Sequence, residues 1–565
     1  MSSIAPEQQN ITSESGRAAM DRDARQTVSA VAVLACAWPA LLLATVCLLP
    51  FLNKPFLIDD PWYLAMARQI LKHPAHPMDF EICWNNPWLS GECAKAAQFA
   101  SGNPLMGQVG QGYVLVPTVL GGAHEWMAHL TQLVLAWIAI VSMSSLALRF
   151  GWDRWHAMAG ALLLVAIPPF LPMASTAMPD ILSTTLALVA IERLAAWKAE
   201  QKANRGIAAA VALGLAGFAR SHLVLLLPLA VFFLLDSIKP REMLAQIRRK
   251  PWLWSPVIAG FGLVLTIILI TREPNFAIPP AHFYDGEQRL WRNLFSYLFY
   301  FAVPLPFAFF WFLYRFKAGR IFQICGLLAA ATASSLLLIS HPLVPFCLII
   351  GAGVFCYLIA ETLKRRDHLS LFLFLWLLIP LPIVSYVHLP MKYLLPCVPA
   401  VILICFRWME GFSVRFFRAS VLVFVLVSTA YSILILRSDA EFAEFGRDAL
   451  HQLITPQVAA GKSVWFPGQY WSFWYAPLDG ASLTYPGGPQ PKPGDLVVVD
   501  VFGAGAGDRQ LERFPRRTFV EAVTHTYRFG RTMGPGVGLY TNTYGFWLWG
   551  FSESEDDRFE LWRID

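Results

Sequence analysis

The sequence predicts a mostly α-helical, polytopic membrane protein that carries a small α/β domain at its C-terminal end. Hydrophobic residues make up 56% of its 565 residues and charged residues 15%, whereas soluble domains contain about 25% charged residues. Apolar stretches long enough to cross the hydrocarbon recur along the chain up to residue 436. Beyond that point, short strand-like runs alternate with Gly and Pro turns.

The N-terminal residues 1–27 mix charges and lack a signal-peptide cleavage pattern, so we expect a cytoplasmic tail before a first span that stays as an anchor. Further spans follow at intervals within a membrane domain of residues 28–436. The predicted spans cover residues 28–50, 126–147, 155–174, 181–196, 253–271, 293–314, 321–340, 343–361, 369–389, 392–406 and 419–436.

The apolar stretch 206–235 is either one long helix or two short ones that meet near Arg220. Basic clusters flank it at 193–205 and 239–250. Because basic loops stay in the cytoplasm, an even number of crossings must separate these clusters. The sequence therefore predicts two half-spans, about thirteen spans in total, and an extracytoplasmic chain after Arg437.

Three regions face outward in this topology. They are the loop 51–125, a loop at about 272–292, and the C-terminal domain, residues 437–565, with expected strands at 494–500, 538–541 and 559–564. The net charge of +6 comes from short clusters between spans, which is a topology signal and excludes a nucleic-acid partner. We expect a multi-pass protein of the cell membrane, typical of a bacterial inner membrane.

Two of the nine cysteines, Cys83 and Cys93, lie in the first outer loop. On the oxidising side of a membrane they either form a short disulfide or pack as two free thiols. The spacing of Cys and His shows no zinc pattern. We therefore predict no metal and no cofactor, although a divalent ion would be compatible with the chemistry discussed below.

Adjacent aspartates, Asp59 and Asp60, follow the first span. Carboxylates beside a membrane are costly unless water or a ligand meets them, so they indicate a functional site. Asp60 precedes Pro61 and is placed to cap a helix over 62–72. A cap can also be functional, so Asp60 is a candidate catalytic residue as well, together with Asp180. Capping does not explain Asp59, which we predict to be catalytic.

Other charged residues are expected on the same side of the membrane. Asp180 opens the fourth span, where it either complements the helix dipole or lines a cavity with Asp59. Arg220 and Lys392 either snorkel to the interface or, with Tyr393, bind a lipid phosphate. A further outer loop could add contacts through the residues His282, Arg289 and Arg292.

Four short motifs resemble the GT-C glycosyltransferases, in particular protein O-mannosyltransferases and lipid A aminoarabinose transferases. They occur in matching order across residues 28–436. Two departures keep the charge: Asp60 stands where the family usually has Glu, and Arg220 where it usually has Lys. The motifs are Asp59-Asp60-x-x-Tyr63, Met178-Pro179-Asp180, the segment 214–228 around Arg220, and Lys392-Tyr393-x-x-Pro396-x-x-Pro399.

This resemblance implies a hexosyl- or pentosyltransferase that takes a sugar from a polyprenyl-phosphate donor. The acceptor would be a glycan, lipid or protein on the extracytoplasmic side. Asp59 would act as general base in an inverting transfer, with Asp180 lining the site, and Arg220, Lys392 and Tyr393 would hold the lipid phosphate. The alternative is a transporter or flippase of lipid-linked sugars, although transporters often show repeated halves and ionisable residues near the membrane midplane.

Overall fold

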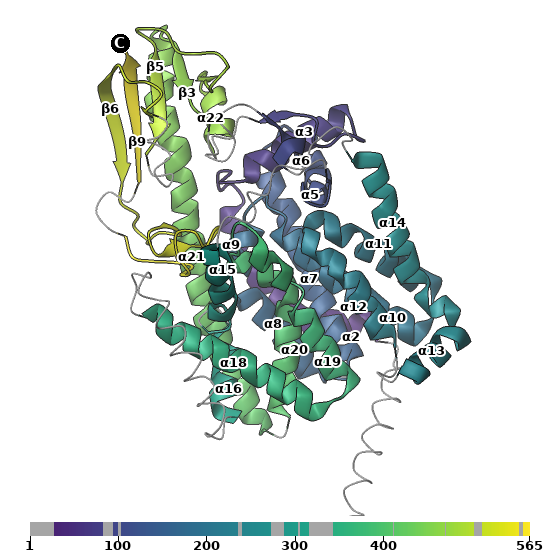
Figure 1. Ribbon diagram of the computed structural model, residues 1–565. Coiled ribbons are helices and arrows are strands. Elements are labelled where there is room, and N and C mark those ends of the chain that lie inside the picture. The colour runs from purple at the N-terminus through teal and green to yellow at the C-terminus, as the bar shows by residue number, and fades with distance from the viewer. Residues whose placement is uncertain are drawn as a thin grey trace, which may run out of the picture.

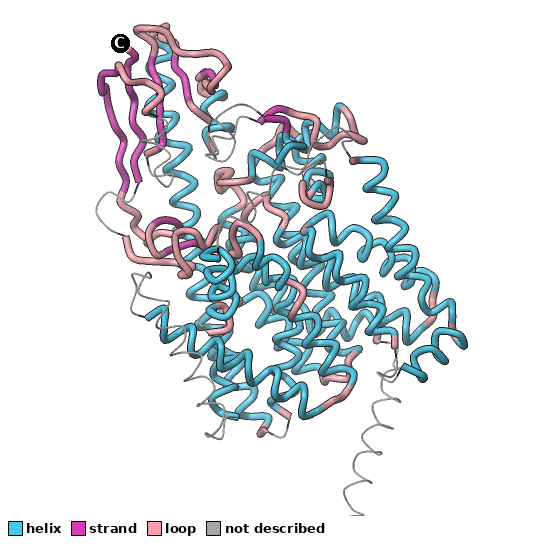
Figure 2. Tube along the Cα trace, in the orientation of Figure 1, coloured by secondary structure: helices cyan, strands magenta, loops and turns pink. Residues whose placement is uncertain are grey.

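The computed structural model describes residues 28–82, 94–99, 103–235, 240–272, 287–302, 305–315, 343–410, 412–468, 471–501, 511–552 and 557–565. Within these ranges, a bundle of helices carries a smaller sheet at one end (Figure 1). Loops gather at that end of the bundle, beneath the sheet (Figure 2). Cys83, Cys93, His282 and the predicted span 321–340 lie outside the described residues.

Several helices of the described ranges are long and apolar enough to cross a membrane, so the chain is a multi-pass membrane protein. The predicted total of about thirteen also counts shorter helices and the undescribed span, and it stays a prediction. The seven long stretches are Ala30–Phe51, Glu125–Arg149, Pro251–Thr271, Val344–Arg365, His368–Ser385, Met391–Met409 and Val414–Ala459, and the shorter apolar ones are Arg154–Ala166, Ala203–Ala219 and Ser221–Leu234.

The first half of the bundle centres on α7 (Glu125–Arg149), which packs against α2 (Ala30–Leu48), α8 (Arg154–Ala166) and α10 (Asp180–Glu200). Short helices lie over one end of this group, on the side where the sheet stands (Figure 1). The short helices are η1 (Leu49–Phe51), α3 (Asp60–Lys72), α4 (Ala96–Phe99), α5 (Val109–Val114), α6 (Val116–Leu120) and α9 (Phe170–Ala174). Between α3 and α4 in the chain, the two-residue strands β1 (Glu81–Ile82) and β2 (Ala94–Lys95) pair antiparallel.

The predicted break at Arg220 is confirmed. Helix α11 (Ala203–Ala219) ends there, with Arg220 extended at φ −146° and ψ 123°, and the 3-10 turn η2 (Ser221–Leu225) leads into α12 (Leu226–Leu234). Lys198, near the end of α10, donates to the Phe233 carbonyl near the end of α12 at 2.9 Å. The two half-helices therefore return the chain to the end of the bundle that it left.

The second half of the bundle places α20 (Val398–Met409) against α8, α16 (Pro306–Arg315) and α19 (His368–Leu377). A short 3-10 helix, η7 (Met391–Cys397), leads into α20 and contacts α10. The remaining helices of this half and of the preceding segment are α13 (Pro240–Arg249), η3 (Pro251–Trp254), α14 (Ser255–Thr271), α15 (Glu287–Phe299), α18 (Leu343–Arg365) and η6 (Leu381–Ser385).

Close packing of α15 on α18 depends on Gly351, because a Cβ at that position would overlap the Leu298 carbonyl oxygen. We expect Gly351→Ala to lower the unfolding free energy by about 1–3 kcal/mol, since backbone must move to make room. Gly262→Ala in α14 is the matched control, because open space surrounds Gly262, and it should gain up to about 1 kcal/mol of helix propensity. Thermal unfolding in detergent, followed by tryptophan fluorescence, separates the two, and equal midpoints would contradict this packing account.

Helix α21 (Val414–Ala459) joins the bundle to the C-terminal domain. Its 46 residues span about 69 Å, more than twice the roughly 30 Å of hydrocarbon. The predicted domain boundary at 436/437 falls inside this helix. Residues 419–436 carry no charge, and acids and arginines recur from Arg437 onward, so one continuous helix leaves the apolar bundle and carries the sheet (Figure 1).

The sheet has five described strands in the order β4-β3-β5-β9-β6. Strand β3 pairs in parallel with β4 and β5, while β9 pairs antiparallel with β5 and β6. With α21 and α22 (Ser472–Leu478) beside it, the domain is α/β, as the sequence predicts. The strands are β3 (Val464–Phe466), β4 (Ser482–Leu483), β5 (Leu496–Asp500), β6 (Arg517–His525) and β9 (Asp557–Ile564).

The expected strands at 494–500 and 559–564 are confirmed as β5 and β9. The expectation of a strand over 538–541 is wrong, because only a two-residue pairing of β7 (Met533–Gly534) with β8 (Val537–Gly538) forms there. Residues after β8 instead leave the sheet and reach the bundle. Strand β6 escapes sequence analysis because most of its residues are exposed on an edge strand and show no alternating apolar pattern.

Candidate functional site

The loop that carries the aspartate pair is strained and tightly held. Ile58 has a positive φ of 49°, which is costly for a β-branched residue and persists only where surrounding contacts impose it. One such contact is the Phe56 amide, which donates to the Tyr475 hydroxyl at 2.7 Å. The turn therefore sets the direction in which Asp59 leaves the backbone.

Asp60 is fully buried and ties two turns together. Its carboxylate accepts from the Leu57 amide at 2.9 Å and from the Ala177 amide at 2.8 Å. The prediction that Asp60 caps α3 is wrong, because these amides lie outside that helix. Burial raises the pKa of Asp60 to about 7, although nearby Lys54 and the two amides oppose the rise.

Asp59 stands at the N-terminus of α3 and makes no side-chain capping bond. Its side chain keeps part of its surface accessible, and no hydrogen-bond partner for its carboxylate lies among the described residues. Burial raises the pKa of Asp59 above its ordinary value, while the Lys392 ammonium and then the Arg220 guanidinium oppose that rise. Asp59 is thus an uncommitted carboxylate within electrostatic reach of two cations.

Asp180 and Arg220 form a buried ion pair beneath this turn. Arg220 Nη2 lies 2.6 Å from Asp180 Oδ1, and its guanidinium carbon lies 4.2 Å from the centre of the Tyr393 ring. Asp180 Oδ2 and Arg220 Nε are buried without a hydrogen-bond partner in the described part of the chain. The pair therefore retains both a free acceptor and a free donor.

Lys392 is 2% exposed, at the start of η7. Its ammonium lies 3.3 Å from Met178 Sδ and 4.9 Å from the centre of the Tyr540 ring. No carboxylate forms an ion pair with it over the described ranges. A buried ammonium whose direct contacts in the described ranges are a sulfur atom and aromatic rings, with carboxylates only farther away, is poorly compensated, so this position suits a negatively charged ligand.

The loop before Lys392 is fixed from several sides. Tyr393 Oη lies 2.9 Å from His388 Nε2, and Arg292 Nη2 donates to the Val387 carbonyl at 2.6 Å. The Arg292 side chain therefore holds the backbone of this loop. Arg289 lies in α15, one turn before Arg292, and His282, as noted above, lies outside the described ranges.

Sequence analysis missed three residues of this cluster: Lys54, Asp439 and Tyr540. Lys54 and Asp439 form a fully buried ion pair, and the Tyr540 hydroxyl donates to Asp439 Oδ2 at 2.7 Å. They lie 385 and 101 residues apart in the chain, so no local pattern links them. The signal available was Lys54 itself, a charge close to the end of an apolar span.

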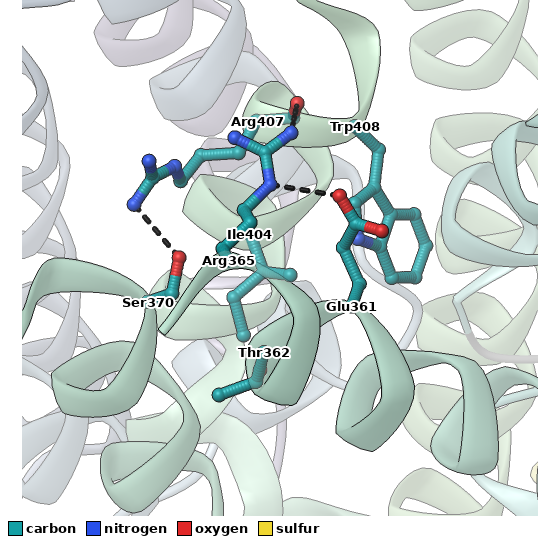
Figure 3. Close-up of a pocket in the computed structure, with 7 residues that line it drawn as sticks. All are labelled: Glu361, Thr362, Arg365, Ser370, Ile404, Arg407 and Trp408. Atoms are coloured by element: carbon teal, nitrogen blue, oxygen red, sulfur yellow. Dashed lines mark hydrogen bonds and ion pairs between the residues drawn. The ribbon is translucent and has the colours of Figure 1, made fainter. Parts of the chain in front are cut away.

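A second polar cluster lies at the far end of α20 and is shown in Figure 3. Arg365 donates to Glu361 at 2.8 Å and to the Arg407 carbonyl at 2.8 Å, and Arg407 donates to Asp367 at 2.6 Å. With their donors engaged in this way, the arginines join two helix ends, and we assign the cluster to stability. The cluster surrounds a small pocket, which is lined by Glu361, Thr362, Arg365, Ser370, Ile404, Arg407 and Trp408.

No family model and no curated protein matches this sequence. Two solved structures of ArnT from Cupriavidus metallidurans are similar to it, each with 14% sequence identity. The one bound to undecaprenyl phosphate aligns over 86% of this chain and 96% of its own, with a TM-score of 0.49. The apo structure aligns over 79% and 84%, with a TM-score of 0.44.

Proposed function

We propose that this protein is a membrane glycosyltransferase that moves a sugar from a polyprenyl-phosphate donor to an acceptor at the extracytoplasmic face. The observation that carries the proposal is the buried Lys392 ammonium, which has no carboxylate partner in the described ranges and lies within electrostatic reach of uncommitted Asp59. Such a transfer requires two groups: a cation that binds the donor phosphate, and a carboxylate that accepts a proton from the acceptor.

The cations account for the donor phosphate. Leaving an ammonium buried and unpaired is costly, and a phosphate would offset that cost. Arg220 keeps its Nε free while its Nη2 is held by Asp180, so the guanidinium is oriented before a ligand arrives. As the bond to the sugar breaks, negative charge grows on the phosphate, and two fixed cations stabilise it. Tyr393, whose ring stacks on Arg220, keeps that cation in place.

The three acids have different roles in this proposal. Asp60 is committed to the Leu57 and Ala177 amides, and Asp180 to Arg220. Asp59 alone of the three has no such commitment, and we assign it the role of general base that deprotonates the acceptor. With one available carboxylate, a single displacement with inversion at the anomeric carbon follows.

The position of the site suits a lipid-linked substrate. Asp59 follows the apolar stretch Ala30–Phe51, Lys392 lies at the start of Met391–Met409, and Arg220 follows Ala203–Ala219. The charges therefore stand at the ends of apolar helices, near the interface. The prenyl tail would lie in the lipid and the sugar would project toward the outer loops. In the proposed topology, the tail 1–27 is cytoplasmic and the domain 437–565 lies outside a bacterial inner membrane.

We propose that no metal or other cofactor takes part, because Arg220 and Lys392 supply the charge that a divalent ion otherwise supplies to a departing phosphate. The acceptor is a hydroxyl or phosphate of a glycan, lipid or protein, and the sugar is a hexose or pentose.

The test uses purified protein in liposomes loaded with undecaprenyl-phosphate sugars labelled in the sugar, a membrane extract as acceptor source, and EDTA. We expect the donor to be consumed and the label to appear in an acceptor product, with EDTA present. Donor that moves between leaflets without being consumed would replace the enzyme by a flippase. Activity lost in EDTA and restored by a divalent ion would overturn the metal-independent mechanism.

A further inference from the structure

A C-terminal segment from Thr532 to Asn542 is linked to both loops that form the candidate site. It contains the paired strands β7 and β8 and is closed by the Leu539 amide, which donates to the Thr532 carbonyl at 3.0 Å. This turn brings the Thr532 and Tyr540 side chains to one carboxylate, that of Asp439 on α21, at 3.3 Å and 2.7 Å. The segment is thus anchored at the point where α21 leaves the bundle.

The first contact runs to the loop that presents Asp59. Asp439 pairs with Lys54, which stands in the loop ahead of Asp59. Lys54 also donates to Ser175 Oγ at 3.2 Å, in the turn whose Ala177 amide binds Asp60. The Asp439 carboxylate therefore holds both chain segments that Asp60 ties together.

The second contact runs to the loop that presents Lys392. The Tyr540 ring lies 4.9 Å from the Lys392 ammonium, close enough for a cation–π interaction. Two residues further on, Asn542 accepts from the Leu389 amide at 3.1 Å and donates to Asn293 of α15 at 2.9 Å. One short segment of the C-terminal domain thus fixes the start of the loop that presents Lys392.

We propose that Tyr540 is a positioning residue of the donor site and that the C-terminal domain completes this site. The ring keeps the Lys392 ammonium where the donor phosphate binds. The hydroxyl, through Asp439 and Lys54, keeps the loop that ends at Asp59. Because one side chain contacts Lys392 directly and the Asp59 loop by way of Asp439 and Lys54, it holds the base and the cation at a fixed separation. This inference rests on the proposed function, since it assumes that Lys392 binds phosphate.

Tyr527 offers a matched control for a purely structural role. Its hydroxyl donates to Asp557 Oδ2 at 2.6 Å, and it is as buried as Tyr540. It packs against Phe442 and Phe445 of α21 within the C-terminal domain. Tyr527→Phe therefore removes the same kind of hydrogen bond from the same domain, at a position where the partner, Asp557, belongs to the sheet.

The experiment measures kcat and KM for the lipid-linked donor, the Kd for undecaprenyl phosphate and the thermal midpoint of four proteins. Tyr540→Phe keeps the ring and loses the hydroxyl, so kcat should fall about tenfold with an unchanged Kd. Tyr540→Leu also loses the ring, so the Kd should weaken roughly fivefold or more. Tyr527→Phe should lower the midpoint as Tyr540→Phe does, with the kinetics of the wild type.

A Tyr540→Leu protein with the Kd and kcat of the wild type would overturn the positioning role. So would a Tyr527→Phe protein with the same kinetic loss as Tyr540→Phe, because the effect would then be general to the domain. A failure of the proposed function would look different, because the wild type would then bind undecaprenyl phosphate and consume no donor. In that case the Kd values of the wild type and the two Tyr540 variants would still decide the role of the ring.

Discussion

Replacing Asp59 by Asn should abolish most sugar transfer while leaving the protein folded and able to bind undecaprenyl phosphate. The amide cannot accept the acceptor's proton, so kcat should fall about 10²- to 10⁴-fold. The Asp59 carboxylate makes no hydrogen bond within the described ranges, so its replacement by an amide should hardly change the thermal midpoint. In the wild type, the rate should rise with pH through a pKa above the ordinary aspartate value, because burial opposes ionisation of Asp59, and the variant should lack that rise.

Asp60→Asn is the matched control for this prediction. An amide can accept from only one of the Leu57 and Ala177 amides, and its own NH₂ group faces the other. We expect a lower thermal midpoint and a loss of activity that follows the loss of folded protein. Full transfer activity by Asp59→Asn would remove Asp59 from the mechanism, whatever the behaviour of Asp60→Asn.

Replacing Lys392 by Met should weaken donor binding without lowering the stability of the fold. The thioether fills the space of the lysine stem and removes a buried charge that lacks an ion pair, so stability should hold or rise. The phosphate then loses a charge-assisted contact, and the Kd for undecaprenyl phosphate should weaken by about 10- to 100-fold. Thermal unfolding and lipid-binding titrations on the same samples measure both effects.

Lys198→Met provides the control at the other end of the bundle. Lys198 donates to the Phe233 and Leu235 carbonyls and lies at the opposite end of α10 from Asp180. Its loss should lower stability and leave the lipid affinity unchanged. If Lys392→Met is destabilised and binds undecaprenyl phosphate as the wild type does, Lys392 is a structural cation and the donor site lies elsewhere.

Much of the candidate site could be predicted because charges stand out against an apolar chain. Asp59, Asp180, Arg220 and Lys392 each lie at the end of an apolar segment, where a charge needs a reason. The break at Arg220 also followed from physics, since basic flanks on both sides demand an even number of crossings. The five-residue 3-10 turn after Arg220 confirms the break, and the direction of the crossings stays a prediction.

What could not be predicted depends on tertiary contacts. Asp60 before Pro61 matches a helix-capping pattern, but its carboxylate instead binds an amide 117 residues away. Asp439 and Tyr540 reach the site because α21 continues beyond the bundle and the chain after β8 folds back. Neither the continuation of α21 nor the fold-back of the chain has a periodic or compositional signal, so the contacts of the C-terminal domain with the site could not be predicted from the sequence.

The most direct test of the central claim is the stoichiometry and stereochemistry of one turnover. Purified protein would be mixed with an excess of acceptor and a donor of known anomeric configuration. Mass spectrometry would count the undecaprenyl phosphate released, and NMR would give the configuration of the product. The account predicts one undecaprenyl phosphate per sugar transferred and an inverted anomeric centre. A retained configuration would contradict Asp59 as the base of a single displacement, and transfer without release of undecaprenyl phosphate would contradict the donor itself.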